Sequence, residues 1–284
     1  MRMLYTVPTK IMTKVIDVGS NSVRLMSIVD GVKSKILKTT QLGRGLHESG
    51  RLGEDEMQAT IQAIGEFLDG DKGYIFATEA VRASQNGKEF CKKVEELYHI
   101  KVDLLSKEEE ARAGFLGATG GTVSSVIDIG GASTEFATQS EDGFRSISLP
   151  LGAVRLTDMK ALGVDTTNYS QGLLQDFTFD KKVYAIGGTA TSIALMVQNL
   201  TTYEIDKVHG YILRPNEVKR LLESLDGLYG EKIYERYPVI GKKRASVIYE
   251  GIKLLDIIIT RYSIKELIVS DSDNTEGYLL LRNL

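Results

Sequence analysis

The sequence has few of the residues that mark disulfide scaffolds and common hydrolytic centres. Its 284 residues include no tryptophan, one cysteine, three histidines and four prolines. Because Cys91 stands alone, no disulfide can form within the chain, which fits a reducing compartment. No serine lies in the context of a nucleophile elbow, so Ser-His-Asp catalysis has no support. The spacing of His47, His99 and His209 is not that of a metal site, and we assign none to them.

Long hydrophobic runs are also absent. No window approaches the roughly 18 apolar residues that span a bilayer, and residues 1–14 lack the apolar core of a signal peptide. The formal charge of −3 gives no support to a nucleic-acid-coating or membrane-surface protein. We therefore expect a cytoplasmic protein without nucleic-acid or membrane partners, long enough for two domains. The sequence leaves open whether the chain forms a homodimer.

One stretch, VIDIGGASTEFAT (126–138), predicts a strand, a glycine turn and a returning strand. Gly130 and Gly131 leave backbone N–H groups unobstructed, and such a turn can cradle phosphate oxygens. Asp128 and Glu135 flank the turn, which suggests a divalent cation between protein and phosphate. By itself the stretch is equally consistent with a plain glycine hairpin in an apolar sheet.

The same pattern occurs earlier in the chain, at a constant offset of 111 residues. VIDVGSNSVRL (15–25) aligns with VIDIGGASTEF (126–136), and in both copies a third extended segment follows that ends near Leu-Gly. This indicates the duplication of a whole domain. Two equivalent turns would then face one another across a cleft. The alignment superposes Asp17 on Asp128, Gly19 on Gly130 and Ser22 on Ser133.

Between the two copies, strands alternate with helices, which predicts mixed sheets with helices packed on them. The Asp-Gly pair at 30–31 predicts a hairpin, and 54–68 a helix. Ser106 and Glu109 form a capping box that opens another helix. We place the domain boundary near residue 120, which gives domains 1–120 and 121–271. The final segment, about 272–284, is left free to pack back on the first domain.

Further candidates for chemistry lie at strand and helix ends. Gly187, Gly188 and Thr189 join a strand to a helix, whose N-terminus would favour an anion; a close packing turn is about equally consistent. Glu108 to Glu110 open a helix, where the dipole alone could explain them, but one of them could activate water. Arg82 could bind a phosphoryl group. The basic run at 242–244 is either a solvated helix start or a guide for a polyanion.

Six segments in this order resemble one family. They are DVGSNSVRL, TEAVR, LSKEEEARAGF, VIDIGGASTEF, SLPLGAVRL and YAIGGTATSIA, and together they resemble the exopolyphosphatase and guanosine pentaphosphate phosphohydrolase family of the actin-like ATPase superfold. The resemblance implies an α/β fold of two duplicated actin-like (ribonuclease H-like) domains. Each is expected to be a mixed five-stranded sheet with flanking helices, with the active site in the interdomain cleft.

The resemblance also implies an activity and a site. It implies release of terminal orthophosphate from inorganic polyphosphate, or of the 5′ γ-phosphate from guanosine pentaphosphate, with Mg²⁺ required. The catalytic base falls on Glu110 and the phosphate-binding arginine on Arg82. Asp128 and Glu135 match acids near the metal, and Asp17 is a further candidate ligand. The phosphate-loop residues fall on Gly19, Ser20, Asn21, Ser22, Gly130, Gly131 and Ser133.

The chain departs from the family's pattern at two places. Ala132 stands where many relatives have glycine, which is tolerable if its φ is negative. Thr275 stands where the family usually has arginine before Glu-Gly. Two alternatives stay open: a weakly catalytic sensor of guanosine tetraphosphate, pentaphosphate or polyphosphate, and an ATP-using kinase of the same superfold. Measured phosphate release would separate the enzyme from the sensor.

Overall fold

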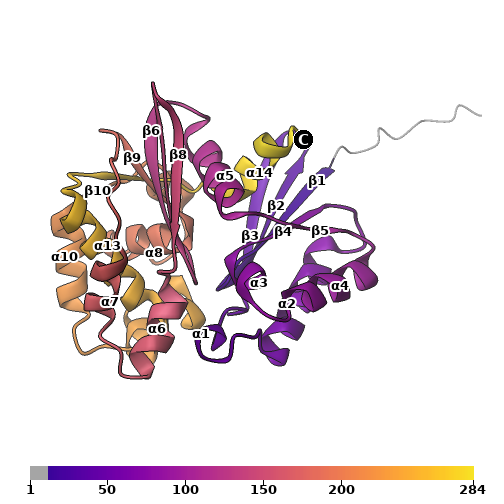
Figure 1. Cartoon of the computed structure of the whole chain (residues 1–284), viewed down its shortest axis with the longest axis horizontal. Helices are drawn as coiled ribbons and strands as arrows, with labels where there is room; N and C mark the ends of the chain where they lie inside the picture. Colours follow the sequence, from indigo (N-terminus) through magenta and orange to yellow (C-terminus); the bar gives the residue numbers. More distant parts are fainter. Residues whose placement is uncertain (1–11) are drawn as a thin grey trace, which may run out of the picture.

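The computed structural model describes residues 12–284; residues 1–11, which hold most of the segment tested above for a signal peptide, lie outside the described part. The chain forms two halves, each a β-sheet with helices packed on it (Figure 1). None of the helices within residues 12–284 combines the length and the apolar character needed to cross a bilayer.

The first sheet has five strands in the order β3-β2-β1-β4-β5. β1, β2 and β3 form an antiparallel meander, and β4 and β5 continue the sheet parallel to β1. The predicted hairpin at Asp30 and Gly31 is confirmed, with positive φ at both residues. The strands are β1 (Met12–Val18), β2 (Ser22–Val29), β3 (Val32–Thr39), β4 (Tyr74–Ala77) and β5 (Val102–Leu104).

Helices α2 and α4 cover one face of this sheet because each buries one apolar stripe. Met57, Ile61 and Ile64 of α2 and Phe90 of α4 belong to the same buried cluster as Ile16 of β1. The predicted helix at 54–68 is confirmed. The helices of this half are α1 (Leu46–Ser49), α2 (Glu54–Leu68), α3 (Glu79–Ala83) and α4 (Gly87–Tyr98).

The second sheet repeats the antiparallel meander and has six strands, in the order β10-β11-β9-β6-β7-β8. The prediction of five strands is wrong here, because Ile212 and Leu213 form a sixth strand antiparallel to β11. Two residues are too few to show a strand periodicity in sequence. The strands are β6 (Ser124–Ile129), β7 (Thr134–Ser140), β8 (Gly143–Leu149), β9 (Val183–Ile186), β10 (Ile212–Leu213) and β11 (Leu267–Val269).

Most helices of the second half pack on one face of this sheet and share a large apolar core with it. Residues 242–262 form two separate helices, α12 and α13. The helices are α6 (Ala153–Ala161), α7 (Thr166–Leu173), α8 (Gly187–Val197), α9 (Ile205–Val208), α10 (Pro215–Ser224), α11 (Glu231–Arg236), the 3-10 turn η1 (Pro238–Ile240), α12 (Lys242–Ala245) and α13 (Ile248–Tyr262).

Two helices, α5 (Lys107–Thr119) and α14 (Asn274–Arg282), lie between the sheets (Figure 1). α5 follows the first sheet but packs on the second, where Phe115 contacts the cluster that includes Val126. α14 follows the second sheet but packs on the first through Tyr278, which stacks on Phe76 at 4.7 Å between ring centroids. The domain boundary near residue 120 remains a prediction, since each of these helices packs on the sheet of the opposite half.

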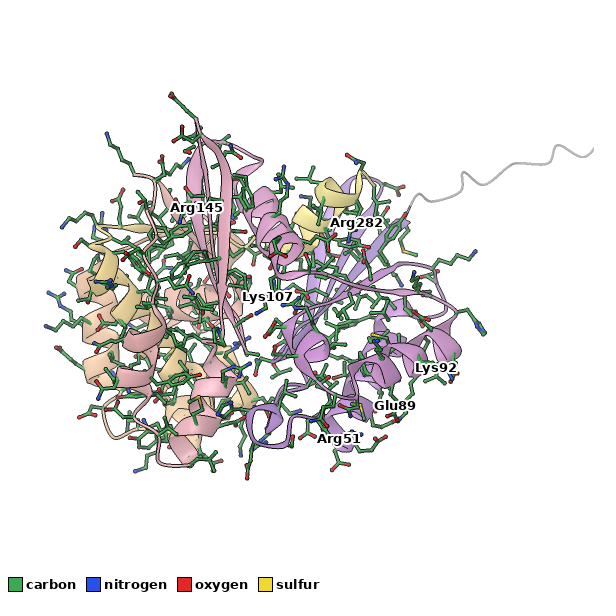
Figure 2. The ribbon with its side chains drawn as sticks, viewed as in Figure 1. Arg51, Glu89, Lys92, Lys107, Arg145 and Arg282 are labelled. Atoms are coloured by element: carbon green, nitrogen blue, oxygen red, sulfur yellow. The ribbon has the colours of Figure 1, made fainter. Side chains whose placement is uncertain are left out.

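The crossing of α5 and α14 brings backbone against backbone. A Cβ on Gly277 would lie 1.6 Å from the carbonyl oxygen of Ala113, and one on Gly117 would lie 1.9 Å from that of Asp273. Arg282 at the end of α14 (Figure 2) donates hydrogen bonds to Asp103 (2.8 Å) and Glu109 (2.7 Å). The two glycines therefore set how closely the helices approach.

Candidate active site

A small cavity of about 80 Å³ lies between the two halves, where β1 and β6 end. Both duplicated turns reach it, together with the N-terminus of α8, the first turn of α5 and the start of α14. Its lining residues are Asp17, Gly19, Ser20, Asn21, Ser22, Arg24, Thr78, Glu110, Asp128, Ile129, Gly130, Gly131, Ser133, Glu135, Gly187, Gly188, Arg244 and Asn274.

The two glycine turns are built alike and touch each other. The N–H of Gly19 donates to the carbonyl of Ser22 at 3.1 Å, and that of Gly130 to the carbonyl of Ser133 at 2.9 Å. A Cβ on Gly131 would lie 2.7 Å from the Cβ of Ser20, so the second turn meets the first closely. The predicted arrangement of two turns facing each other is what the structure shows.

The glycines that open α8 leave room for charged side chains. Gly187 has φ +79°, and a Cβ there would lie 2.5 Å from Oδ1 of Asp128. A Cβ on Gly188 would lie 2.4 Å from Arg244. Thr189 does not reach the cavity: it is buried, and its hydroxyl donates to the carbonyl of Ile129 at 2.8 Å. The glycine pair thus borders the cavity, whereas Thr189 fastens α8 to β6.

Four carboxylates, Asp17, Glu110, Asp128 and Glu135, converge on the cavity, and burial raises the pKa of each. The pKa of Asp17 rises to about 6, where burial outweighs the lowering effect of Arg24. The pKa of Glu110 rises to about 7, again through burial, with Arg82 opposing the rise. Glu135 has a pKa well above its usual range, because it is buried and lies near Glu110 and Asp128. Such a cluster favours a bound cation.

The donor set fits a magnesium ion. Oδ1 of Asp17 is buried and has no hydrogen-bond partner among the described residues. Across residues 12–284 no three His, Cys, Asp or Glu side chains are disposed to hold a metal by themselves. Mg²⁺ usually takes one or two carboxylates, with waters and phosphate oxygens completing the octahedron. Asp17 and Asp128, one from each half, are therefore sufficient protein donors, with Glu135 beside them.

The structure places Arg82 next to Glu110 and outside the cavity lining. Its guanidinium donates to Glu110 at 2.9 Å, to Glu79 at 2.6 Å and to the carbonyl of Leu105. Two other arginines line the cavity instead: Arg24 on β2 and Arg244 on α12. Arg244 is buried, and burial lowers its pKa to about 10. Arg82 thus contacts Glu110, the expected base, while Arg24 and Arg244 supply the positive charges of the cavity lining.

Sequence reasoning missed five of the lining residues, although most carried a signal. Arg24 aligns with Glu135 in the internal duplication. Arg244 belongs to the basic run at 242–244, whose two lysines are exposed at the start of α12, whereas Arg244 itself is buried against Gly188. Asn274 comes directly before Thr275, where the chain departs from the family's pattern, and its amide donates to Asp128 at 3.4 Å. The five are Arg24, Thr78, Ile129, Arg244 and Asn274.

Two halves with the same meander, each sending a glycine turn to a shared cavity, define an actin-like fold with a site suited to phosphoryl groups. Residues 15–283 match the Ppx/GppA phosphatase family, and the chain belongs to this family. The structure of the Aquifex aeolicus PPX-GPPA enzyme is 29% identical, with a TM-score of 0.75, covering 95% of this chain and 99% of that one.

Two curated relatives are similar over part of their length. A bifunctional 3-dehydroquinate synthase/phosphatase of Fusobacterium nucleatum is 28% identical, over 93% of this chain and 46% of that protein. A guanosine-5'-triphosphate,3'-diphosphate pyrophosphatase of Photobacterium profundum is 31% identical, over 49% of this chain and 31% of that protein. The alignments thus cover less than half of either relative.

Proposed function

We propose that this chain is a magnesium-dependent phosphohydrolase that releases terminal orthophosphate from inorganic polyphosphate or the 5′ γ-phosphate from guanosine pentaphosphate. The observation that carries the proposal is the buried Glu110 carboxylate, which lines a cavity between two glycine turns and hydrogen-bonds to Arg82. Membership of the Ppx/GppA phosphatase family and the name of the Photobacterium relative support the same reaction.

The proposed reaction needs donors for the phosphoryl oxygens and a base for water. The N–H groups of the two glycine turns and of the α8 N-terminus are the expected donors, with Arg24 and Arg244 adding positive charge. A magnesium ion, when bound, would offset the negative charge of the phosphate oxygens, and Asp17 and Asp128 would hold it.

Glu110 takes the proton of the attacking water as the water oxygen bonds to the terminal phosphorus. The bond from that phosphorus to the bridging oxygen breaks, and its electron pair leaves with the shortened substrate. Arg82 positions the Glu110 carboxylate through the 2.9 Å hydrogen bond and opposes the rise that burial causes in its pKa, which stays at about 7.

The test is a Glu110→Gln variant assayed for orthophosphate release with Mg²⁺ and each of the two substrates. Loss of a general base should lower turnover by roughly 10²–10⁴-fold. Glu108→Gln is the matched control, because Glu108 is an exposed acid in the same helical turn and should leave turnover unchanged. Near-normal activity of the Glu110 variant would refute the assignment. Tight binding of both substrates to the wild type without phosphate release would favour a sensor.

A further inference from the structure

An ion pair between Arg24 and Asp273 joins β2 to the start of α14 at the edge of the active-site cavity. Arg24 lines that cavity, whereas Asp273 lies outside its lining and directly precedes α14. The two side chains are 15% and 5% exposed, so solvent screens the pair only weakly. Within residues 12–284, the Arg24 guanidinium has no other ion pair and no hydrogen bond to a second side chain. Asp273 is therefore the contact that orients Arg24.

A different acid is also within reach of Arg24. Asp17 lies directly opposite Arg24 in the β1–β2 pair, and Cβ atoms of such residues are about 4.5–5.5 Å apart. Opposite charges in this arrangement attract each other. Oδ1 of Asp17 is nevertheless buried without a hydrogen-bond partner, and among the described residues Asp17 forms no ion pair with Arg24. The pair with Asp273 thus keeps Arg24 off Asp17 and leaves the Asp17 carboxylate to the cavity.

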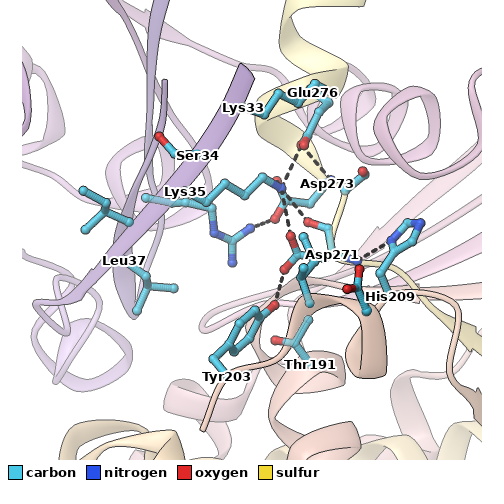
Figure 3. A pocket seen from close by; sticks show the side chains of 15 residues that line it. Lys33, Ser34, Lys35, Leu37, Thr191, Tyr203, His209, Asp271, Asp273 and Glu276 are labelled. Carbon is cyan, nitrogen blue, oxygen red and sulfur yellow. Dashed lines mark hydrogen bonds and ion pairs between the residues drawn. The ribbon is translucent and has the colours of Figure 1, made fainter. Parts of the chain in front are cut away.

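Asp273 is itself held by the first turn of α14. Its Oδ1 accepts a hydrogen bond from the backbone N–H of Thr275 at 3.1 Å, and its own N–H donates to Oε2 of Glu276 at 3.1 Å, which completes a capping box. Lys35 of β3 lies 3.6 Å from the same Oδ1 and 2.9 Å from Glu276 (Figure 3). One carboxylate oxygen of Asp273 thus caps the helix, and Oδ2 pairs with Arg24.

Thr275, where the family usually has arginine, belongs to the same arrangement. Its side chain is fully buried, and its hydroxyl lies 3.0 Å from Oδ1 of Asp273 and 3.0 Å from Oε2 of Glu276. The hydroxyl has one proton, which it can donate to either acceptor. With the backbone N–H, this hydroxyl restricts how the Asp273 carboxylate can turn. The departure from the family's pattern therefore lies next to the residue that holds Arg24.

We infer that Asp273, held by Thr275, positions Arg24 for the phosphate of the substrate. The helix fixes one oxygen of the carboxylate, and the other oxygen fixes one end of the guanidinium. Because a guanidinium has five N–H donors, the pair with Asp273 leaves further donors of Arg24 to a phosphate in the cavity. This inference rests on the proposed function, and it gives positioning roles to two residues outside the cavity lining.

The first experiment measures the binding of methylenediphosphonate by calorimetry with Mg²⁺, because the P–C–P bridge of this diphosphate analogue is not hydrolysed. Asp273→Asn keeps the size of the side chain and its ability to cap α14, but it removes the charge that holds Arg24. Kd should rise about threefold to tenfold, as is usual for residues coupled in one ion-pair network. Asp165→Asn is the matched control, since Asp165 caps α7 in the same way, and it should leave Kd unchanged.

A second arm repeats Asp273→Asn in an Arg24→Gln background. There the added substitution should have no further effect on Kd, because Asp273 has already lost its partner. An equal loss in both backgrounds would mean that Asp273 acts only on the fold of α14 and would overturn the inference. Tighter binding by the Asp273→Asn protein would also overturn it, since Asp273 would then compete with the phosphate for Arg24.

The role of Thr275 is tested with two variants. Thr275→Val removes the hydroxyl and keeps the shape of the side chain, so Kd should rise about twofold to threefold. Thr275→Ser keeps the hydroxyl and should bind the analogue as the wild type does. Thermal melts show whether each variant is folded. Equal binding by the two folded variants would show that the hydroxyl does not help to hold Asp273.

Kinetic measurements separate the positioning role from the proposed hydrolysis. Asp273→Asn should raise KM for a short polyphosphate by the same factor as Kd and change kcat by less than about twofold, because it weakens binding alone. If the chain released no orthophosphate but Asp273→Asn weakened binding of the analogue, the positioning role would stand and the hydrolysis would be refuted. Normal hydrolysis together with unchanged binding by Asp273→Asn would do the reverse.

Discussion

The two duplicated turns carry the same acid but opposite charges on the returning strand. Asp17 pairs across β1 and β2 with Arg24, whereas Asp128 pairs across β6 and β7 with Glu135. Directly opposed residues in an antiparallel pair have Cβ atoms about 4.5–5.5 Å apart. The first turn therefore has a cation beside its acid, and the second has a further acid.

Because of this difference, we expect the two turns to play different roles in the site. Burial raises the pKa of both Asp17 and Glu135, but Arg24 opposes the rise at Asp17, whereas Glu110 and Asp128 add to the rise at Glu135. A phosphate approaching the first turn meets positive charge, but one approaching the second needs an added cation. We expect changes at Glu135 to act through magnesium and changes at Arg24 to act through substrate binding.

Between the two turns, the larger effect is expected from Glu135→Gln. Removing an acid that supports a metal site typically costs about 10–100-fold in metal affinity or activity. The variant should therefore need more Mg²⁺ for half-maximal activity, as measured by titrating the ion at saturating substrate. An unchanged Mg²⁺ requirement would show that the second turn is not the cation side of the site.

Arg24→Gln should have a smaller and different effect. A lost hydrogen bond from a charged donor is worth about 1.5–3 kcal/mol, or roughly tenfold and upward in binding. KM should rise by that factor while the Mg²⁺ requirement stays as in the wild type. If Arg24→Gln and Glu135→Gln shifted the same parameter, the contrast between the two turns would be wrong.

The pH profile of kcat/KM should report Glu110. Its pKa of about 7 reflects burial, opposed by Arg82, and the group acts as a base only when deprotonated. Activity should therefore fall as pH drops below about 7, approaching tenfold per pH unit. Arg82→Gln removes the influence that lowers this pKa, so its profile should shift to higher pH. An unshifted profile would mean that Arg82 does not tune the base.

A still smaller effect is expected for Glu110→Gln on the pH dependence of thermal stability. A carboxyl group whose pKa is raised on folding binds its proton more tightly in the folded state than in the unfolded state. Its protonated form therefore contributes fully to stability below the unfolded pKa. This contribution to stability is lost as pH rises through the folded pKa. For Glu110 this window runs from the usual value of 4.5 to about 7. Glu110→Gln should therefore raise Tm at pH about 8, by about 2–4 °C per kcal/mol, relative to its effect at pH about 4. Thermal melts of the wild type and the variant at both pH values test this prediction.

The smallest effect is expected at Ala132, which matches Asn21 in the first turn. Ala132 is not among the residues with positive φ, so its methyl group needs no strained backbone. Ala132→Gly should change turnover by less than about twofold. A large gain in activity would show that the methyl group crowds the phosphate.

Much of the fold could be predicted because its signals are local. The duplication at Asp17 and Asp128, the hairpin at Asp30 and the capping box at Ser106 are patterns of neighbouring residues, and each is confirmed. The sixth strand at Ile212 and Leu213 could not be predicted, since it exists only through pairing with β11, more than 50 residues later.

The site was harder to predict from the sequence, because its charged side chains meet only through tertiary packing. The positions of Arg82 and Arg244 show this best. Arg82 follows a strand that ends near the cavity, yet its guanidinium turns to Glu79 and Glu110. Arg244 follows two exposed lysines in sequence, yet it is buried beside Gly188. Whether an arginine reaches the solvent or a cavity depends on contacts that no local pattern encodes.

The close crossing of α5 and α14 has a mechanical consequence. Because backbone lies against backbone at Gly117 and Gly277, any rotation of one half relative to the other would turn about this crossing. Glu110 stands on α5, which packs on the second sheet, whereas Arg82 stands on α3 of the first. Such a rotation, if it widened the cavity, would draw Glu110 away from Arg82. The hydrogen bond that positions Glu110, and the opposition of Arg82 to the rise of its pKa, would then depend on how closely the two halves approach.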